Sequence, residues 1–490
     1  MTIHDDGLSP EAMLAFYQRL YPFKSIFHWL NHEPAPTRLF VNREFAFTLQ
    51  GDVYLRYNSF ANADELKKQI CTLNPTRFEI GPVYSARPRD KRTVRPTAFK
   101  PLQRELVFDI DMTDYDSVRR CCSEANICSR CWVFIAAAVK VLDRSIRGQF
   151  GYNHLLWVYS GRRGIHLWVS DQEAMELNDE ERKAVANYLT VVGGGKEKKK
   201  KVNVRQGSKP LPPGIGEFIN LLQDIFPPLI LQDQDCFAGE VGAEELLALL
   251  PANAQIEPLR KKWTADPDRS SEEKWDDVRN QVKINGKKTA PGKLLLAAME
   301  DIVLQYTWPR IDAEVSKHRN HLLKAPFCVH PKTGRVCVPV DPTRIDEFDP
   351  AEVPTVGQLL REIDEAMMIN NEDDAEGTQH LPDWEKTSLK PYVALLDAHN
   401  KALMEETRRR KRGDKNTDTS TSKSLSYVVR HRLWPLLRWT IAYEEHVYAQ
   451  VGDVRTHLVT AEGLLPLLLV SILFVPCFVP SLCFRRYIMH

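Results

Sequence analysis

The stretch ELVFDIDMTDYD, residues 105–116, combines an apolar strand pattern with closely spaced acidic side chains. In a strand, Val107, Asp109 and Asp111 share one face, because successive side chains point to opposite sides. The other face carries only apolar residues: Leu106, Phe108, Ile110 and Met112. We therefore expect a core strand that presents two neighbouring carboxylates. Their mutual repulsion predicts a cation between them.

The chain of 490 residues is long for one hydrophobic core and suggests two or three structural units. Hydrophobic residues make up 43% and charged residues 27%, and the net charge is +1, as in an ordinary soluble protein. This balance leaves any nucleic-acid contact to local basic patches. We expect no signal peptide, because the N-terminus is acidic and lacks an apolar segment. The ten cysteines are then typical of thiols or metal ligands rather than disulfides.

One segment departs from this soluble pattern. The run LLPLLLVSILFVPCFVPSLCF, residues 464–484, carries no charge and is long enough to cross a bilayer. It also contains Pro466, Pro476 and Pro480, which a spanning helix tolerates poorly. We expect an atypical apolar extension outside the functional core, with a membrane or lipid-facing tail as the alternative.

The order of periodic patterns predicts the fold class. Expected helices cover 10–34, 61–73 and 132–147, and expected strands cover 43–60, 77–85, 105–112, 154–160 and 165–170. The following part is helical and charged, and strand signals return at 325–340. This order predicts an α+β fold with a helical subdomain inserted into one mixed α/β core.

The expected division of the chain follows from these changes in character. The parts are 1–171 (first part of the core, with a cysteine module at 121–131), 172–305 (helical insertion), 306–370 (second part of the core), 371–412 (acidic linker and terminal helix) and 413–490 (polar linker and apolar extension). The basic run 408–424 is interpreted as a polar, disordered linker. The run KEKKKK, residues 196–201, is interpreted as a solvated loop, with a nucleic-acid contact as the alternative.

The pair Asp109 and Asp111 is spaced to share divalent ions. Polymerase-type sites hold two such ions about 3.5–4 Å apart, and Mg²⁺ prefers oxygen ligands. A short acidic motif alone is weak evidence, but its apolar flanks call for a compensating charge. Asp114 and Asp116 follow the strand and are typical of turn or capping positions.

The segment YSGRRGIH, residues 159–166, joins two apolar strand patterns. Its two glycines allow a tight turn, and Arg162 and Arg163 match phosphate oxygens in shape and charge. Ser160 and His166 add further donors. The segment predicts a phosphate site, with an ordinary basic hairpin as the alternative.

Four cysteines cluster within eleven residues: Cys121, Cys122, Cys128 and Cys131. Four thiolates supply the closed tetrahedral set of a structural zinc site, with free buried thiols as the alternative.

The segment 309–334 contains Asp312, followed by His321, Lys324 and His330. Asp312 could complete a metal site with the first two acids, or be a surface residue.

Together these segments resemble the small, catalytic subunit of the archaeo-eukaryotic DNA primase family, in its eukaryotic form. The similar segments are LVFDIDMTDYDSVRRCC, WVYSGRRGIHLWV, NHLLKAPFCVHPKTGRVCVPV, REFAFTLQGDVYLRYNSF, RFEIGPVYS and KTSLKPYV. The resemblance covers roughly residues 10–412, and residues 424–490 match nothing in the family.

The resemblance implies the prim-fold core and a two-metal nucleotidyl transferase that makes RNA primers de novo on single-stranded DNA. Asp109, Asp111 and Asp312 would hold two Mg²⁺ or Mn²⁺ ions, and the cysteines one structural Zn²⁺. The incoming ribonucleoside triphosphate would bind Ser160, Gly161, Arg162, Arg163, Gly164, His166, Lys324 and His330. His321 would lie near its ribose, with Glu44, Arg56 and Glu79 completing the pocket.

The family's partners are an iron–sulfur large subunit and the DNA polymerase alpha complex, which implies a nuclear protein. The basic run RRRKR, residues 408–412, is a candidate import signal. Two other functions stay open: a repair or bypass primase-polymerase that uses deoxynucleotides, and a non-catalytic scaffold that retains the fold. The three intact acids argue against the scaffold.

Overall fold

The structure is a computed structural model that describes residues 9–193, 199–252, 254–370 and 382–417. All of these belong to one unit, residues 1–435. The apolar run 464–484, the first half of KEKKKK (196–198) and residues 371–381 of the acidic linker lie outside the described residues. Within the described residues, no helix has the length and apolar character needed to span a membrane.

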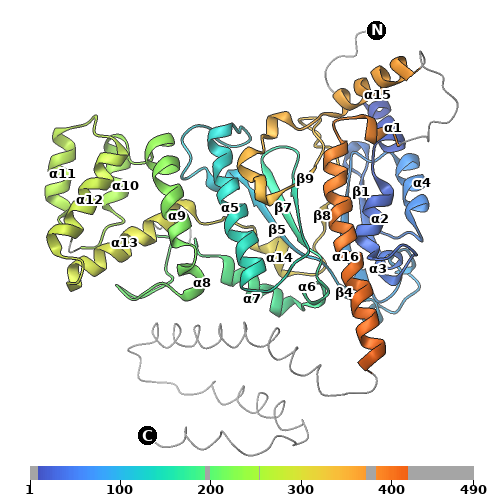
Figure 1. The fold of residues 1–490 in the computed structure, drawn as a ribbon, viewed down its shortest axis with the longest axis horizontal. Coiled ribbons are helices and arrows are strands. Elements are labelled where there is room, and N and C mark those ends of the chain that lie inside the picture. Colours follow the sequence, from blue (N-terminus) through green and yellow to red (C-terminus); the bar gives the residue numbers. More distant parts are fainter. Residues whose placement is uncertain (1–8, 194–198, 253, 371–381, 418–490) are drawn as a thin grey trace, which may run out of the picture. The chain divides into compact units, whose positions relative to one another are not determined.

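Two antiparallel sheets form the centre of the fold (Figure 1). The first sheet has the order β2-β1-β3-β4, with β8 also paired to β3, and consists of β1 (Arg43–Thr48), β2 (Tyr54–Asn58), β3 (Arg77–Tyr84), β4 (Pro101–Gln103) and β8 (Leu323–Lys324). The second sheet has the order β5-β7-β6-β9 and consists of β5 (Leu106–Asp111), β6 (Leu155–Tyr159), β7 (Gly164–Val169) and β9 (Pro339–Val340). Each sheet thus combines strands from both predicted parts of the core.

Helices surround these sheets. Most of the helices between β7 and β8 fall within the predicted insertion, residues 172–305. Those of the first part are α1 (Pro10–Arg19), α2 (Phe23–Asn31), α3 (Arg38–Val41), α4 (Ala63–Leu73) and α5 (Ser129–Gly148). Those between β7 and β8 are α6 (Gln172–Glu176), α7 (Asp179–Leu189), α8 (Pro213–Gly216), α9 (Ile219–Phe226), α10 (Gly239–Leu247), α11 (Ile256–Ala265), α12 (Ser271–Asn285), α13 (Ala290–Thr307) and α14 (Ala313–Lys317). The last two are α15 (Val356–Asn370) and α16 (Lys390–Thr417).

Short helical turns connect the longer elements: η1 (Gln50–Asp52), η2 (Pro88–Asp90), η3 (Pro96–Ala98), η4 (Met112–Tyr115), the π-helical η5 (Pro227–Asp233), η6 (Pro342–Glu347), η7 (Pro350–Glu352) and η8 (Asp383–Lys386).

In the first part of the chain, the structure contains helices and strands close to the predicted positions. Asn62 caps α4 by accepting from the amide of Glu65 at 2.9 Å. The expected strand segment 43–60 forms two strands, β1 and β2, which are separated by a turn where Gly51 has a φ of +72°. On β5, Leu106, Phe108 and Ile110 are fully buried, whereas the two acids are only partly buried. The fold class is α+β, as predicted.

The helices α10 to α13, which fall within the predicted insertion, have a distinct position. In Figure 1, α10 to α13 group on one side of α5, away from the two sheets. By contrast, α7 packs against α14, which in turn packs against β5. The helices α6 and α7 follow residue 172, but they lie beside the core sheets and not with α10 to α13. The start of the insertion at 172 stays a prediction.

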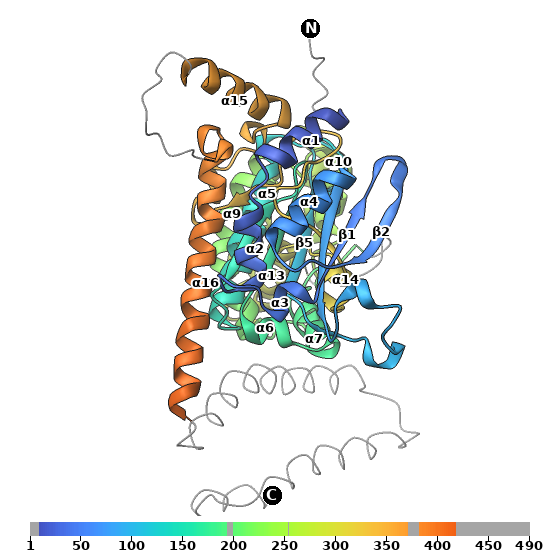
Figure 2. The ribbon, with the colours of Figure 1, turned by 90° about the vertical axis from the view of Figure 1, so that its right-hand side faces the viewer.

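The helix α16 corrects one expectation. The segment 408–417, interpreted as part of a disordered linker, is the end of this helix. Two views show α16 running beside α2 (Figures 1 and 2), and Asn400 donates to the carbonyl of Ser25 at 2.8 Å. Near its end, Arg410 pairs with Glu173 at 2.8 Å. These tertiary partners stabilise a basic helix that looks like a linker in sequence.

Candidate active site

The hairpin between β6 and β7 forms at the predicted turn, residues 159–166. Across the β5–β7 pair, His166 faces Asp109 and Gly164 faces Asp111. An added Cβ at Gly164 would lie 2.4 Å from the carbonyl oxygen of Ile110, so only glycine fits without a backbone shift. The close approach of the two strands places the basic turn beside the acidic strand end.

Asp312 lies next to the Asp109–Asp111 pair. Its amide donates to the carbonyl of Asp109 at 3.0 Å, and its carboxylate caps α14 by accepting from the amide of Glu314 at 2.9 Å. The helix is anchored to β5 by the hydroxyl of Ser316, which donates to a backbone carbonyl of that strand at 2.6 Å. All three acids line one cavity.

A smaller cavity, of about 180 Å³, opens on the hairpin side of the acids. It is lined by eight residues that the sequence singled out: Asp109, Asp111, Ser160, Arg162, Arg163, His166, Lys324 and His330. Lys324 donates to the carbonyl of Ser160 at 2.6 Å, and Thr333 donates its hydroxyl to the carbonyl of Gly161 at 2.7 Å. These bonds dock the segment after α14 onto the hairpin and so assemble the cavity.

Cations dominate the hairpin side of this cavity. Burial and the charge of Lys324 lower the pKa of His166 to about 3. Burial and the charges of Lys324 and Arg162 lower the pKa of His330 to about 4. Both imidazoles are therefore neutral at pH 7, and Arg162, Arg163 and Lys324 carry the positive charge. A polyanion would relieve this repulsion.

The carboxylates show the opposite imbalance. Burial, together with the charges of Asp111 and Asp312, raises the pKa of Asp109 to about 7. The Nε2 atom of His166 lies 3.5 Å from Oδ1 of Asp109, but a neutral ring does not compensate the charge. Carboxylates that repel one another fit divalent cations such as Mg²⁺ and Mn²⁺, which prefer oxygen ligands.

Asp111 connects the acids to the cationic cavity. The Nε atom of Arg163 lies 2.8 and 2.9 Å from its two oxygens, and Thr113 donates from both its amide and its hydroxyl. Burial would raise the pKa of Asp111, but these hydrogen bonds outweigh it and lower the pKa. Any change at Arg163 therefore acts on this carboxylate as well as on a ligand.

Three other residues that the sequence assigned to the nucleotide pocket line neither cavity. Glu44 is fully buried and accepts from Nε of Arg56 at 2.9 Å. Glu79 accepts from the hydroxyl of Tyr54 at 2.6 Å and stands opposite Lys324 in the β3–β8 pair. Glu44 and Arg56 pair with each other, and Glu79 pairs with Tyr54, so these side chains are held outside the two cavity walls.

His321 also lies outside both cavities. Burial and the charge of Arg104 lower its pKa, whereas the charge of Asp312 acts in the opposite direction, which places it near this acid. Gly161 shapes the turn: its φ is +87°, and an added Cβ would lie 2.7 Å from Cβ of His330.

The four cysteines predicted to bind zinc converge at the N-terminus of α5. The Sγ atoms of Cys121, Cys122, Cys128 and Cys131 all lie within 4.8 Å of one another. Within the described part of the chain, no other group of three or more His, Cys, Asp or Glu is gathered this closely. Burial raises the pKa of Cys131 to about 12, so a bound metal would have to displace its proton. The set fits zinc, which four thiolates bind tetrahedrally.

Residues of the predicted helical insertion contact this cysteine group. Gln234 donates to Sγ of Cys121 at 3.4 Å, and Arg130 pairs with Asp233 at 2.7 Å. The cysteine group therefore lies between α5 and the end of η5, a turn within the predicted helical insertion.

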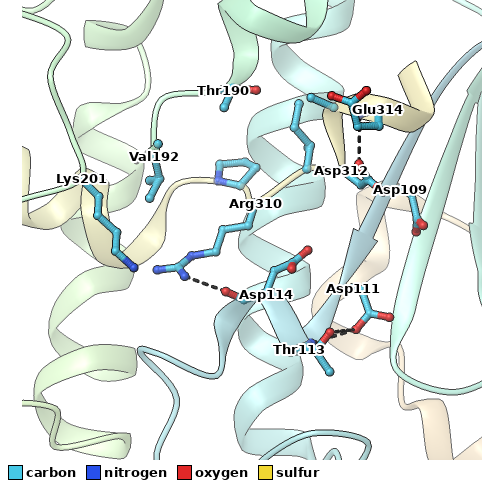
Figure 3. Close-up of a pocket in the computed structure, with 14 residues that line it drawn as sticks. Asp109, Asp111, Thr113, Asp114, Thr190, Val192, Lys201, Arg310, Asp312 and Glu314 are labelled. Atoms are coloured by element: carbon cyan, nitrogen blue, oxygen red, sulfur yellow. Dashed lines mark hydrogen bonds between the residues drawn. The ribbon is translucent and has the colours of Figure 1, made fainter. Parts of the chain in front are cut away.

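A larger cavity, of about 620 Å³, opens on the other side of the carboxylates (Figure 3). Besides the three acids it is lined by residues that the sequence did not assign to the site: Thr113, Asp114, Thr190, Val192, Gly193, Lys201, Pro309, Arg310, Ile311, Ala313 and Glu314. Asp114 faces this cavity, and burial with the charges of Asp111 and Asp312 raises its pKa. The sequence pattern of Asp114 is also typical of a turn residue. Lys201 lies in a basic run that is also typical of a solvated loop.

A protein-family model described as DNA primase small subunit matches residues 108–342. The DNA primase small subunit of Schizosaccharomyces pombe is 46% identical over 426 residues, which cover 84% of this chain and 94% of that protein. The chain belongs to the DNA primase small subunit family. The Saccharomyces cerevisiae protein of the same name is 39% identical over 408 residues, covering 82% of this chain and 94% of that protein.

A more distant similarity falls on part of the chain. The DNA primase small subunit of Pyrobaculum islandicum is 32% identical over 153 residues, covering 31% of this chain and 47% of that protein. Membership in the primase small-subunit family implies a nucleotidyltransferase-type polymerase. The matched range 108–342 contains the three acids, the basic hairpin and the cysteine group.

Proposed function

We propose that this chain is the catalytic subunit of a primase that makes short RNA primers de novo on single-stranded DNA. The observation that carries the proposal is the placement of Asp109 and Asp111 between a cationic cavity and a second, larger cavity. Such an arrangement suits a reaction that joins two nucleotides at a metal-binding edge. The two-sheet core would be the family's prim-fold.

The cationic cavity would bind the triphosphate of the incoming ribonucleotide. Arg162, Arg163 and Lys324 would neutralise its charge, and Ser160, with the two neutral histidines, would supply further hydrogen bonds. His321, with Glu44, Arg56 and Glu79, would support the ribose side. The low pKa values of the histidines would rise once the anion is bound, because its charge favours the imidazolium.

Asp109, Asp111 and Asp312 would hold two Mg²⁺ or Mn²⁺ ions. Bound there, two divalent ions would activate the attacking hydroxyl and stabilise the charge of the leaving pyrophosphate. The protein's own contribution is to hold the three acids on β5 and α14 and to hold the triphosphate against them.

The bond changes are those of nucleotidyl transfer. The 3′-oxygen of one nucleotide forms a bond to the α-phosphorus of the next, and the bond from that phosphorus to the bridging oxygen breaks. Pyrophosphate leaves with the electron pair, and the hydroxyl proton passes to solvent. The arginines and the lysine of the cationic cavity stabilise the negative charge that collects on the pyrophosphate.

The cysteine group would bind one structural Zn²⁺, because four thiolates leave no open coordination position. The name of the relatives, small subunit, supports a large primase subunit as partner. The further partners we propose are the iron–sulfur form of that subunit, DNA polymerase alpha and the single-stranded template. We also propose a nuclear location. In the run 408–412, Arg410 and Lys411 are engaged in ion pairs, which leaves three exposed arginines for import.

The deciding experiment combines single-stranded DNA, ribonucleotides and Mg²⁺ or Mn²⁺ without a primer. Short RNA should appear with the wild-type chain and disappear in Asp109→Ala and Asp111→Ala. Asp268→Asn, an exposed acid in the helical insertion, is the matched control and should retain synthesis. A preference for deoxynucleotides would instead indicate a repair or bypass primase-polymerase. No synthesis even with a large subunit present would contradict both enzymes and leave the scaffold.

A further inference from the structure

The larger cavity has the size of a site for a single small ligand such as one nucleotide, at about 620 Å³. It shares only Asp109 and Asp111 with the cationic cavity, so these two acids lie between the cavities. Figure 3 shows the three acids on one side of it, with Lys201 and Arg310 on the other. A ligand placed here would meet the acids at one end and cations at the opposite end.

The backbone of Lys201 is fixed at the edge of this cavity. Its amide donates to Oε1 of Gln305 at 2.7 Å, and the amide group of Gln305 donates to the carbonyl of Lys199 at 2.9 Å. The carbonyl of Lys201 accepts from the amide of Gly193 at 2.9 Å. A held backbone directs the lysine side chain into the cavity, where Figure 3 shows it pointing toward Arg310.

The ammonium of Lys201 has no carboxylate partner among the residues that the structure describes. Burial and the charge of Arg310 lower its pKa, which shows that two cations lie near each other. The guanidinium of Arg310 donates to the carbonyl of Asp114 at 2.6 Å and to that of Gln305 at 3.3 Å. Arg310 therefore supplies mainly charge, while Lys201 keeps free donors. Arg310 has the acidic side chain of Asp114 nearby, whereas Lys201 has no carboxylate of the described residues within ion-pair distance, so this pair of cations indicates an anion site centred on Lys201.

The reaction geometry identifies the anion. In phosphoryl transfer the attacking and leaving oxygens lie roughly in line, on opposite sides of the phosphorus. If pyrophosphate leaves toward Arg162, Arg163 and Lys324, the attacking hydroxyl comes from the larger cavity. We infer, on the basis of the proposed function, that this cavity holds the nucleotide that supplies the 3′-hydroxyl and that Lys201 binds a phosphate of it. In initiation that nucleotide is a free triphosphate, and in extension it is the end of the growing strand.

A matched pair of lysines tests the inference in the full-length chain. Lys201→Ala removes the cavity cation, whereas Lys200→Ala removes a neighbour that pairs with Asp301 at 3.0 Å and lines neither cavity. The probe is a fluorescent RNA primer annealed to a DNA template, measured by anisotropy without nucleotides. We expect binding about 3- to 10-fold weaker in Lys201→Ala, with a slope of log K against log salt smaller by about one. Lys200→Ala should match the wild type, and Lys201→Arg should restore binding.

Kinetics separate the two nucleotide sites. In Lys201→Ala the KM for primer–template should rise, and the KM for the incoming nucleotide should not. A rise in the KM of the first nucleotide during unprimed synthesis, with unchanged hybrid binding, would assign Lys201 to the initiating triphosphate and also support the inference. The inference is wrong if Lys201→Ala equals Lys200→Ala in every assay, or raises only the KM of the incoming nucleotide. If the wild-type chain makes no RNA, the proposed function fails, and the binding comparison still decides the role of Lys201.

Discussion

The backbone amide of Asp312 donates a hydrogen bond to the carbonyl of Asp109 at 3.0 Å, and so joins two segments far apart in the chain. The contact brings a third carboxylate to two that already repel each other, and the pKa of Asp109 rises to about 7. The three carboxylates therefore repel one another, and a bound divalent cation would stabilise their arrangement.

The first prediction concerns Asp312→Asn. This change keeps the shape of the side chain and its cap on α14 but removes a charge. Primer synthesis should fall on the order of 10²-fold or more, as for loss of one charge-stabilising group. The melting temperature in a chelator should stay the same or rise, because a repulsion disappears. A large fall in that melting temperature would show that Asp312 acts through the fold instead. Asp268→Asn serves as control.

The second prediction concerns the close contact of β5 and β7. Gly164→Ala places a methyl group 2.4 Å from the carbonyl oxygen of Ile110, so the strands must separate. Overpacking of this kind costs about 1–3 kcal/mol of folding free energy, and the displaced acids should lower activity as well. Gly148→Ala, where nothing lies within 4 Å, should be neutral or stabilise by about 0.4–1 kcal/mol. Denaturant unfolding of both variants checks this; equal stabilities would contradict it.

The outcome for β5 and the hairpin shows what the sequence could predict. Alternation along β5 and the glycines at 161 and 164 are local signals, and the structure places them as expected. The position of Asp312 depended on a family resemblance, because nothing local shows which strand a distant acid will meet. The joining contact is a backbone hydrogen bond, which any residue type can make.

The structures of Lys201 and of the end of α16 could not be predicted, because their sequence patterns fit more than one structure. Lys201 sits in a basic run that looks solvated, and only the fold shows that Gln305 holds it at a cavity. The end of α16 looked like a linker because its partners, such as Glu173 for Arg410, come from a distant segment. In both cases the composition predicts a solvated segment, but contacts with residues distant in the sequence hold the segment against the fold.

The third prediction separates the two arginines of the turn. Arg162 has no carboxylate partner among the described side chains, so Arg162→Ala should raise the KM for the nucleotide about tenfold and change kcat little. Arg163→Ala should raise that KM and also lower kcat, because Asp111 loses the guanidinium 2.8 Å from its oxygen. Steady-state kinetics with each variant distinguish the two. An unchanged KM in Arg163→Ala would remove it from the phosphate site.

The fourth prediction concerns the cysteine group. Cys128→Ser should reduce the zinc content from about one ion to none and lower the melting temperature, because metal binding contributes to folding. Cys71→Ser changes a thiol outside the group and should leave the zinc content unchanged. Native mass spectrometry and thermal unfolding measure both effects. A wild-type chain without zinc, purified without chelators, would contradict the assignment.

The last prediction concerns pH and the contact between α2 and α16. His32, at the end of α2, is buried, and His399, on α16, is partly buried; each has a buried ring Nε2 without a hydrogen-bond partner. Burial is the main cause that lowers the pKa of His32 to about 4 and that of His399 to about 3. Neighbouring charges are smaller causes; around His32 they are Glu105, Arg43, His154 and Arg410, and around His399 they are His154, His32 and Arg147.

The sign of the pH effect follows from these shifts. The unfolded chain protonates both rings below about pH 6.5, whereas the native chain keeps them neutral until much lower pH. Stability is therefore complete above pH 6.5 and falls as the pH drops toward 4, by up to about 1.4 kcal/mol per pH unit for each ring. In His399→Leu the loss of folding free energy per pH unit should be smaller by the contribution of one histidine. Met404→Leu, on the same helix, removes no titratable group and should keep the wild-type slope. Urea unfolding at pH 7, 6 and 5 measures it, and an unchanged slope in His399→Leu would mean that other groups govern acid unfolding.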